Sequence, residues 1–203
     1  MKPILIIDYG MGNLRSVQKA FEKVGHEARI SPHPEDVDAA EKVVLPGVGA
    51  FKDAARHLRE SHFAEPIARH IDSGKPFLGI CLGLQLLFER GHEDGTHQGL
   101  GILRGDVVRF DPQPGLKIPH MGWNSLNIRK EAPIFRDLPG EPFVYFVHGY
   151  YPKPTDADVV AAEADYPGPF CCAVWRDNLM ATQFHPEKSQ RVGLAMLRNF
   201  AGM

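Results

Sequence analysis

A cysteine between two glycines is the residue of this sequence best placed for nucleophilic chemistry. Cys81 follows the apolar run Phe77 to Ile80, which predicts a buried strand, and precedes a helix-like stretch from Leu82 to Arg90. A thiol at a helix N-terminus lies beside unpaired backbone N–H groups, which stabilise thiolate over thiol. Gly79 and Gly83 permit the sharp turn of a nucleophile elbow. The alternative is a buried structural cysteine, which is common after an apolar strand.

A base and its orienting partner are available far downstream in the sequence. His185 and Glu187 follow an expected strand that ends at Gln183. A thiol nucleophile needs an imidazole to take and return a proton, and the imidazole needs a carboxylate or amide to hold its tautomer. Pro186 keeps the backbone between them extended or in a turn, so that both side chains are presented from a strand end. The alternative is a histidine and a glutamate on a solvated loop.

Two glycine-rich loops are expected near the thiol, DYGMGNL (8–14) and PGVGAF (46–51). Backbone N–H groups of PGVGAF could face a developing oxyanion, with the N–H of Leu82 as a second donor. The first loop lacks the third glycine of a dinucleotide fingerprint, so we expect no nucleotide cofactor. Gln85, one helical turn after Cys81, could orient an amide substrate, and Glu93 could pair with an α-ammonium group. For both residues the alternative is a solvated polar position.

Composition limits the classes of protein that this chain can be. Its 203 residues, 43% hydrophobic and 24% charged, predict a single domain over residues 1–203. A net charge of −2 without a long basic run argues against nucleic acid or a membrane as partner. The N-terminal apolar run is too brief for a signal sequence, so we expect a soluble, cytoplasmic protein. The adjacent Cys171 and Cys172 suit neither a disulfide framework nor a zinc site, and we expect no metal and no cofactor.

The first half alternates short β-type runs with helix-type runs, which predicts an α/β fold with a mostly parallel central sheet and flanking helices. Ligands of such sheets bind beyond the carboxyl ends of the strands, where Cys81 lies. Asn13 is the expected N-cap of the first helix. The expected elements are Ile4 to Asp8, Leu14 to Val24, Lys42 to Leu45, Phe63 to Ser73 and Phe77 to Ile80.

The second half predicts short antiparallel strands separated by proline and glycine. Asp177 and Asn178 stand at hairpin spacing, so the strand leading to His185 is the expected return arm. A helix whose apolar face includes Val192, Met196 and Phe200 is expected at the end. The expected strands are Asp106 to Phe110, Ser125 to Ile128, Phe143 to Val147, Val159 to Ala164, Cys171 to Trp175 and Leu179 to Gln183.

Six motifs, in this order over nearly the full length, resemble those of the class I glutamine amidotransferases: DYGMGN, PGVGAF, GICLGLQLLF, PHMGWN, YFVHGYY and QFHPEKS. DYGMGN, PGVGAF and PHMGWN are most similar to the glutaminase subunits of imidazole glycerol phosphate synthase. The resemblance implies a flavodoxin-like amidotransferase domain. It also implies that Cys81 is the nucleophile, His185 the general base and acid, and Glu187 its orienting partner, in an enzyme that hydrolyses glutamine to glutamate and ammonia.

The resemblance further implies an oxyanion hole at Val48, Gly49 and Leu82, and glutamine contacts from Gly47, Gly49, Gln85, Glu93, His148 and Gly149. The implied partner is a (βα)8-barrel cyclase subunit, which forms a heterodimer with the glutaminase, uses its ammonia in histidine biosynthesis and raises its otherwise weak activity. Asn13, Trp123, Tyr145 and Lys188 would lie at the shared interface.

One position departs from the family pattern. Gly149 stands where a serine or threonine is common, so a hydroxyl contact to glutamine is in doubt.

Three other functions stay open from the residues alone. They are the glutaminase subunit of another amidotransferase, a Cys-elbow hydrolase acting on esters or peptides, and a non-catalytic module whose aromatic surface binds a partner.

Overall fold

The strands at the centre of the molecule are apolar on both faces. In the computed structural model, which describes residues 2–138 and 141–203, every residue of β1 (Ile4–Ile7), β3 (Val43–Gly47) and β4 (Phe77–Cys81) is buried. Continuous apolar runs of this kind are typical of parallel strands that are covered on both sides. The three strands are neighbours and pair in parallel.

The central sheet has the strand order β2-β1-β3-β4-β14-β13-β12-β9. Its parallel part runs from β2 (Ala28–Ser31) to β14 (Leu179–Thr182), and the pairing is antiparallel from β14 onward. The antiparallel strands are β13 (Pro169–Arg176), β12 (Val160–Asp165) and β9 (Asn127–Ile128). Both the mostly parallel sheet and the β13–β14 hairpin that leads to His185 are therefore confirmed.

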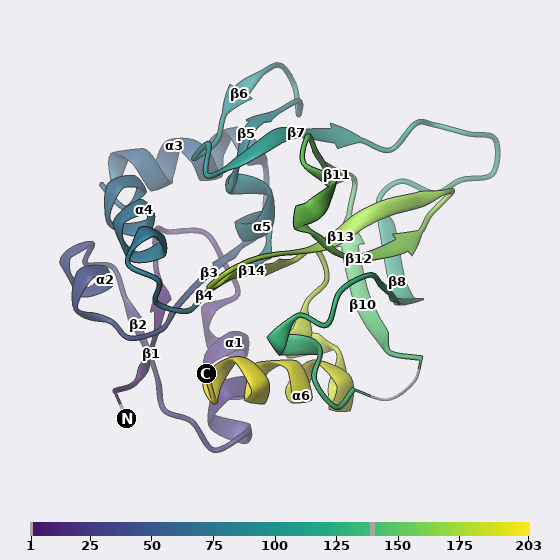
Figure 1. Cartoon of the computed structure of the whole chain (residues 1–203). Helices are drawn as coiled ribbons and strands as arrows, with labels where there is room; N and C mark the ends of the chain where they lie inside the picture. Colours follow the sequence, from purple (N-terminus) through teal and green to yellow (C-terminus); the bar gives the residue numbers. More distant parts are fainter. Residues whose placement is uncertain (1, 139–140) are drawn as a thin grey trace.

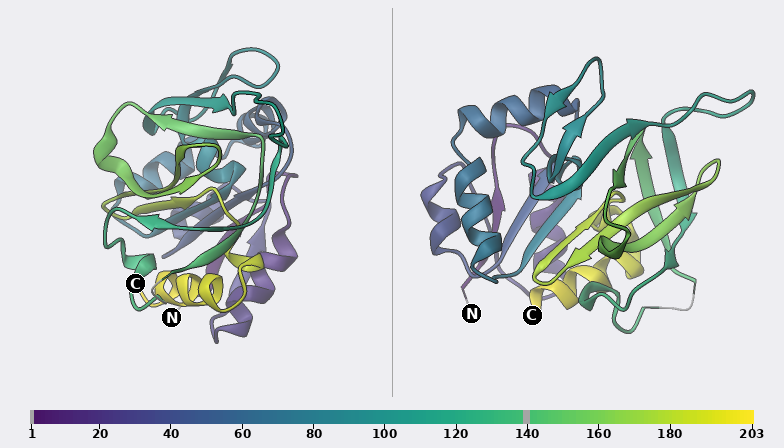
Figure 2. Two further views of the ribbon diagram at one scale, coloured as in Figure 1. Left: turned by 90° about the vertical axis from the view of Figure 1, so that its right-hand side faces the viewer. Right: turned by 45° about the horizontal axis from the view of Figure 1, so that its top comes forward.

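Helices cover the two faces of this sheet (Figures 1 and 2). On one face lie α1 (Leu14–Lys23) and α6 (Gln190–Ala201). The other face is covered by α2 (Glu35–Ala39), α3 (Phe51–Glu60), α4 (Ala64–Asp72) and α5 (Leu82–Leu86). Because side chains alternate along a strand, Ile4 and Ile6 join the core under α1 and α6, whereas Leu5 and Ile7 join the core on the opposite face.

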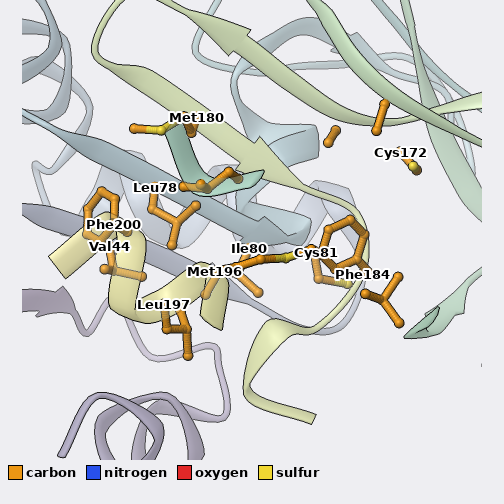
Figure 3. Packing of buried hydrophobic residues seen from close by; sticks show 14 of the residues in the cluster. Val44, Leu78, Ile80, Cys81, Cys172, Met180, Phe184, Met196, Leu197 and Phe200 are labelled. Carbon is orange, nitrogen blue, oxygen red and sulfur yellow. The ribbon is translucent and has the colours of Figure 1, made fainter. Parts of the chain in front are cut away.

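The core under α6 leads directly to the cysteine. Figure 3 shows Met196 and Phe200 of α6 on the side of the helix that faces the sheet, with Cys81 at the end of β4 beside Phe184. Burying one such side chain contributes roughly 1.5–3 kcal/mol to the free energy of folding, so this packing fixes the end of β4 relative to α6. The position of Cys81 is thus set by the rigid core.

Two smaller sheets lie beside the carboxyl-terminal side of the main sheet (Figure 1). One pairs β8 (His120–Ser125) with β10 (Phe143–His148). The other has the order β11-β7-β5-β6 and comprises β11 (Tyr150–Pro154), β7 (Leu103–Arg109), β5 (Phe88–Gly91) and β6 (His97–Gln98). Short 3-10 turns are η1 (Pro133–Phe135), η2 (Ala157–Val159) and η3 (Pro186–Lys188).

The expected helix from Leu82 to Arg90 is wrong over its second half. The helix ends at Leu86, and the chain continues as β5. The carbonyl of Leu86 accepts a hydrogen bond from the N–H of Leu100 at 2.8 Å, and the carbonyl of Phe88 accepts one from Gly101 at 3.2 Å. These partners come from a later loop, so tertiary hydrogen bonds override the local helical pattern.

Two other expectations need correction. The predicted strand from Ser125 to Ile128 is split between β8 and β9, because Leu126 turns inward and is buried. Asn13 does occupy the N-cap of α1, but its side-chain oxygen accepts a hydrogen bond from the Ser16 hydroxyl at 2.9 Å and caps no backbone N–H. The sequence did not lead us to expect β2, α2, α3, β5, β6 or β11, and the predicted strand included only the last residue of β8, Ser125.

Candidate active site

Cys81 stands in a strained turn between β4 and α5. Its backbone angles are φ 56° and ψ −109°, which are costly for a residue with a side chain. Glycines on either side make the turn possible, because a Cβ on Gly83 would collide with the carbonyl of Leu45 and a Cβ on Gly79 would lie 3.0 Å from Ala181. This is the geometry of a nucleophile elbow, which lifts a reactive atom above the sheet.

The neighbouring strands bring the other predicted groups to the same edge. In the sheet order β3-β4-β14, Gly47 is the register partner of Cys81, so the PGVG loop begins beside the sulfur. On the other side, Thr182 pairs with Ile80, and the chain leaving β14 reaches His185. Parallel strands end at one edge, which is why residues so distant in sequence meet there.

His185 and Glu187 form a buried pair. Nδ1 of His185 lies 2.8 Å from Oε1 of Glu187, and their side chains are only 3% and 1% exposed. The other ring nitrogen, Nε2, has no hydrogen-bond partner among the described residues. The carboxylate thus fixes the ring and leaves Nε2 to exchange a proton with the sulfur or with a substrate.

The charge state of His185 follows from its neighbours. Burial lowers the pKa of the imidazole, but Cys81 and Glu187 outweigh that effect and raise it to about 10. Because a raised pKa means that the charged form is preferred, the site favours an imidazolium at His185 beside the sulfur of Cys81. A neighbouring imidazolium favours reaction of a cysteine as a nucleophile.

The backbone of His185 is tied to the strand that carries Tyr145. The N–H of His185 donates to the carbonyl of Tyr145 at 3.0 Å, and the N–H of Tyr145 donates to the hydroxyl of Ser189 at 3.0 Å. That hydroxyl in turn donates to the carbonyl of His185 at 2.6 Å. A shift of β10 would therefore move the imidazole.

A cavity of about 270 Å³ opens above the sulfur, which is large enough for a small amino acid. Of the predicted site residues, Gly47 and Glu187 do not line it: Gly47 lies in register with Cys81, and Glu187 is paired with His185. The lining residues are Val48, Gly49, Cys81, Leu82, Gln85, Glu93, Pro119, Val147, His148, Gly149, Tyr150 and His185.

Two polar residues of the cavity also make internal bonds. Oε2 of the half-buried Glu93 accepts a hydrogen bond from the N–H of Phe51 at 2.7 Å, which anchors the end of the PGVGAF loop. Gln85 is only 5% exposed, so it is not the solvated helix position considered as an alternative. Its Nε2 donates to the carbonyl of Tyr150 at 3.0 Å, which leaves its oxygen for other contacts.

The residues of the predicted oxyanion hole line the same cavity as Cys81. Leu82 is the first residue of α5, directly after the cysteine. In the PGVG loop, Gly49 has φ +98°, a conformation that favours glycine, and the side chain of Val48 is 40% exposed. The loop thus places Gly49, in a left-handed conformation, next to the exposed apolar side chain of Val48.

Three of the four predicted interface residues lie together on one surface. Trp123 of β8 and Tyr145 of β10 are register partners, with ring centroids 6.1 Å apart, and Nζ of Lys188 lies 5.9 Å from the Tyr145 ring. Met121 and Phe143 add exposed apolar area on the same two strands, being 62% and 48% exposed. The fourth, Asn13, begins α1, a helix that packs against η3.

Sequence analysis missed two buried polar residues near the sulfur. Gln183 is fully buried, and its Nε2 lies 3.7 Å from Sγ of Cys81. Tyr9 is 2% exposed, its hydroxyl has no partner in the part of the chain that the structure describes, and burial together with the Cys81 charge raises its pKa. The available signal for Gln183 was a polar residue at the end of an apolar strand, immediately before the His185 motif.

Over residues 2–138 and 141–203, no group of three or more His, Cys, Asp or Glu side chains is arranged to hold a metal ion. Within the same residues, no helix has the length and apolar character that crossing a membrane would require.

Comparison with known proteins agrees with this geometry. A sequence model described as "Glutamine amidotransferase class-I" matches residues 5–202. Solved structures with the same fold include PurLQS from Thermotoga maritima, with a TM-score of 0.79 at 20% identity, covering 100% of this chain and 99% of that one. A glutamine amidotransferase from the same organism has a TM-score of 0.64 at 18% identity, covering 94% of this chain and 78% of that one. The chain belongs to the class-I glutamine amidotransferase family, which confirms the expected fold class.

Curated relatives narrow this assignment. The protein named imidazole glycerol phosphate synthase subunit HisH from Syntrophotalea carbinolica is 62% identical over 98% of this chain and 100% of its own length. The protein of the same name from Aquifex aeolicus is 53% identical over 97% of this chain and 94% of its own. Within the amidotransferases, the sequence therefore falls among the HisH proteins, as the motif resemblance indicated.

Proposed function

We propose that this chain is the glutaminase subunit of an imidazole glycerol phosphate synthase, in which Cys81, His185 and Glu187 hydrolyse glutamine and supply ammonia for histidine biosynthesis. The single observation that carries the proposal is the strained Cys81 elbow, which opens into one cavity with a His185 whose Nδ1 is held by Glu187. The chain is 50–62% identical to proteins named HisH, which supports a subunit of this synthase over a subunit of another amidotransferase.

The reaction follows from these groups. The Cys81 thiolate attacks the side-chain carbonyl carbon of glutamine, and backbone N–H groups near Gly49 and Leu82 stabilise the oxyanion. Nε2 of His185 gives its proton to the leaving nitrogen, and ammonia departs as the thioester forms. His185 then takes a proton from the attacking water, and glutamate leaves as the thiolate and the protonated His185 are regenerated. Glu187 keeps the ring in one orientation throughout.

Substrate recognition uses the cavity wall. The carboxylate of Glu93 is placed to pair with the α-ammonium group, while Gln85, His148 and the backbone of Gly149 line the remaining wall. A Cβ on Gly149 would lie 3.5 Å from Cγ2 of Ile118, which is an ordinary contact. The structure therefore has room for a side chain at this position, although the sequence has none. We expect backbone groups to replace the hydroxyl contact here.

The ammonia requires a second subunit. We propose a (βα)8-barrel cyclase that docks on the surface formed by Trp123, Tyr145 and Lys188, with Asn13 near its rim. The exposed aromatic and apolar area of β8 and β10 supports this, since exposed apolar patches are typical of protein interfaces. The match of the family model to residues 5–202 supports a single glutaminase domain. We also propose that the protein acts in the cytoplasm.

The test uses the complex with the cyclase and compares two nitrogen sources. Cys81→Ala should lower glutamine-dependent product formation by about 10³-fold or more, because the nucleophile is lost, and should leave the reaction with added ammonia intact. Cys172→Ala is the matched control, because this buried thiol lies on β13 and outside the cavity. Full glutamine-dependent activity in the Cys81→Ala complex would rule out the proposed nucleophile.

A further inference from the structure

The sulfur of Cys81 has a polar neighbour besides His185. Gln183 follows β14 and is fully buried, and its Nε2 lies 3.7 Å from Sγ. Its backbone is also fixed, because its N–H donates to the carbonyl of Cys172 at 2.8 Å. A buried amide must satisfy its hydrogen bonds inside the protein. The Cys81 sulfur is therefore a hydrogen-bond partner of the Gln183 amide.

The orientation of the Gln183 amide is determined by its neighbours. Its Oε1 accepts from Nε2 of Gln85 at 3.1 Å, and that same nitrogen donates to the carbonyl of Tyr150 at 3.0 Å. A backbone carbonyl can only accept, so Gln85 must present its nitrogen to Tyr150. Its second N–H then requires an oxygen from Gln183. The nitrogen of Gln183 is left to face the sulfur as a donor.

The same carbonyl is held from a second direction. Nδ1 of His148 lies 2.9 Å from the Tyr150 carbonyl, so this nitrogen carries the proton and Nε2 accepts. Nδ1 of His120 lies 3.1 Å from that Nε2 and is therefore the donor. Burial lowers the pKa of His148 to about 3 and that of His120 to about 4, so both rings are neutral at pH 7 and suit these directions. The carbonyl that sets the Gln85 and Gln183 amides is thus itself fixed.

The helix after the cysteine offers little electrostatic help. α5 has five residues, and the effect of a helix dipole depends on the aligned peptide groups behind it. Cys81 is also 7% exposed and packed in the apolar core cluster, where a thiolate loses its hydration. An oriented N–H donor at the sulfur offsets that loss, because hydrogen bonds to charged acceptors are about twice as strong as those to neutral ones.

We propose that Gln183 is a positioning residue for the nucleophile: its amide N–H donates to the sulfur of Cys81, favours thiolate over thiol and fixes the direction in which the sulfur faces the cavity. The proposal rests on the assignment of Cys81 as nucleophile. It adds a residue outside the Cys–His–Glu set, held by a network that also fixes the Tyr150 wall of the cavity.

The experiment measures the acidity of the thiol directly. In the complex with the cyclase, the rate of alkylation of Cys81 by iodoacetamide is followed from pH 5 to pH 10 by mass spectrometry of the peptide that contains it. Gln183→Leu removes the donor, so the midpoint of the profile should move to higher pH. Glutamine kcat should fall by about tenfold or more with a small change in KM, because the lost bond is to a charged group. The ammonia-dependent rate should stay unchanged.

Thr182→Val is the matched control. It lies one residue earlier, is equally buried, and loses a hydrogen bond from its hydroxyl to the Phe184 carbonyl at 3.1 Å, not to the sulfur. Its alkylation midpoint should equal that of the wild type. An unchanged midpoint in a Gln183→Leu complex that still uses ammonia would overturn the proposal.

If Gln183→Leu does not assemble, Gln183→Met decides the question. The methionine side chain is unbranched and uncharged and has no N–H for the sulfur, so the midpoint should again rise, and an unchanged midpoint again overturns the proposal. The alkylation profile needs no turnover. A wild type that failed to hydrolyse glutamine would refute the proposed function, whereas the difference between wild-type and Gln183 profiles would still report on this bond.

Discussion

At the scale of single residues, the charge of His185 depends on its neighbours Cys81 and Glu187. The imidazole is buried, which by itself favours its neutral form, yet its pKa is raised to about 10 by the sulfur and by Glu187. Oε2 of Glu187 has no partner among the described residues, so His185 provides the main compensation for this buried carboxylate. The sulfur and the carboxylate therefore together hold His185 in its charged form.

This coupling predicts a specific pH dependence of stability. Because the folded pKa of His185 exceeds the unfolded value of about 6.5, its bound proton stabilises the fold at low pH, and that contribution is lost as the pH rises toward 10. The loss of stability should therefore fall between about pH 6.5, the ordinary pKa of histidine, and about pH 10, the pKa of His185 in the folded protein. Urea unfolding of the isolated glutaminase chain at pH 7, 8.5 and 10 measures this loss.

The double variant Cys81→Ala with His185→Gln provides the comparison, because it has neither titrating group. Its free energy of unfolding should fall less than that of the wild type between pH 7 and pH 10. Parallel curves for the two proteins would contradict the raised pKa of His185 in the folded protein.

At the scale of elements, the turn between β4 and α5 controls where the sulfur lies. α5 packs so close to β3 that Gly83 lies against the carbonyl of Leu45. The same closeness brings Leu82 next to the PGVG loop, because a Cβ on Gly47 would lie 3.0 Å from that of Leu82. Glycine at these positions is required by the approach of two backbones rather than by a left-handed conformation.

Two glycines of the cavity region should therefore respond in opposite ways to alanine. Gly83→Ala places a methyl group into the Leu45 carbonyl and should lower the free energy of unfolding by about 3 kcal/mol or more. Gly149→Ala meets only Ile118 at 3.5 Å, and should leave stability unchanged or raise it by about 0.4–1 kcal/mol through the unfolded chain. Urea denaturation of both variants tests this contrast. An unchanged free energy of unfolding in Gly83→Ala would show that the elbow tolerates wider spacing.

At the scale of the whole molecule, the proposed partner surface and the site share one structural element. β10 carries Tyr145, whose ring packs with Trp123 and whose backbone carbonyl binds the N–H of His185. A cyclase that displaced this strand would act on the base through that hydrogen bond and through the Ser189 hydroxyl, which links the backbones of Tyr145 and His185. This gives a physical route by which partner binding could alter glutaminase activity.

The partner surface gives a direct prediction. Trp123 is 47% exposed, and exposed tryptophans at interface centres are frequent hot spots. Trp123→Ala should weaken cyclase binding by about 2 kcal/mol, or roughly 30-fold in Kd, as measured by isothermal titration calorimetry. Ile128→Ala is the control, since Ile128 is 37% exposed but lies on β9 at the edge of the main sheet. Equal losses of affinity in both variants would place the interface elsewhere.

The sequence contained enough to predict much of this molecule. Its apolar runs and their alternation predicted the parallel sheet, and the glycines around Cys81 predicted the elbow. These features are local: a strand buried on both faces needs a continuous apolar run, and a tight turn needs small residues, whatever the rest of the chain does. The same reasoning identified the hairpin that leads to His185.

What the sequence could not predict depends on partners from distant segments. The end of α5 at Leu86 is decided by hydrogen bonds from residues 100 and 101, and the orientation of Gln183 by a carbonyl at Tyr150. Local propensity carries no information about such partners, because a buried amide or carbonyl is satisfied by whatever the fold brings within reach. Residue types and spacing therefore determined which chemistry is possible here, whereas only the packing of β3, β4 and β14 side by side decided which atoms meet at the sulfur.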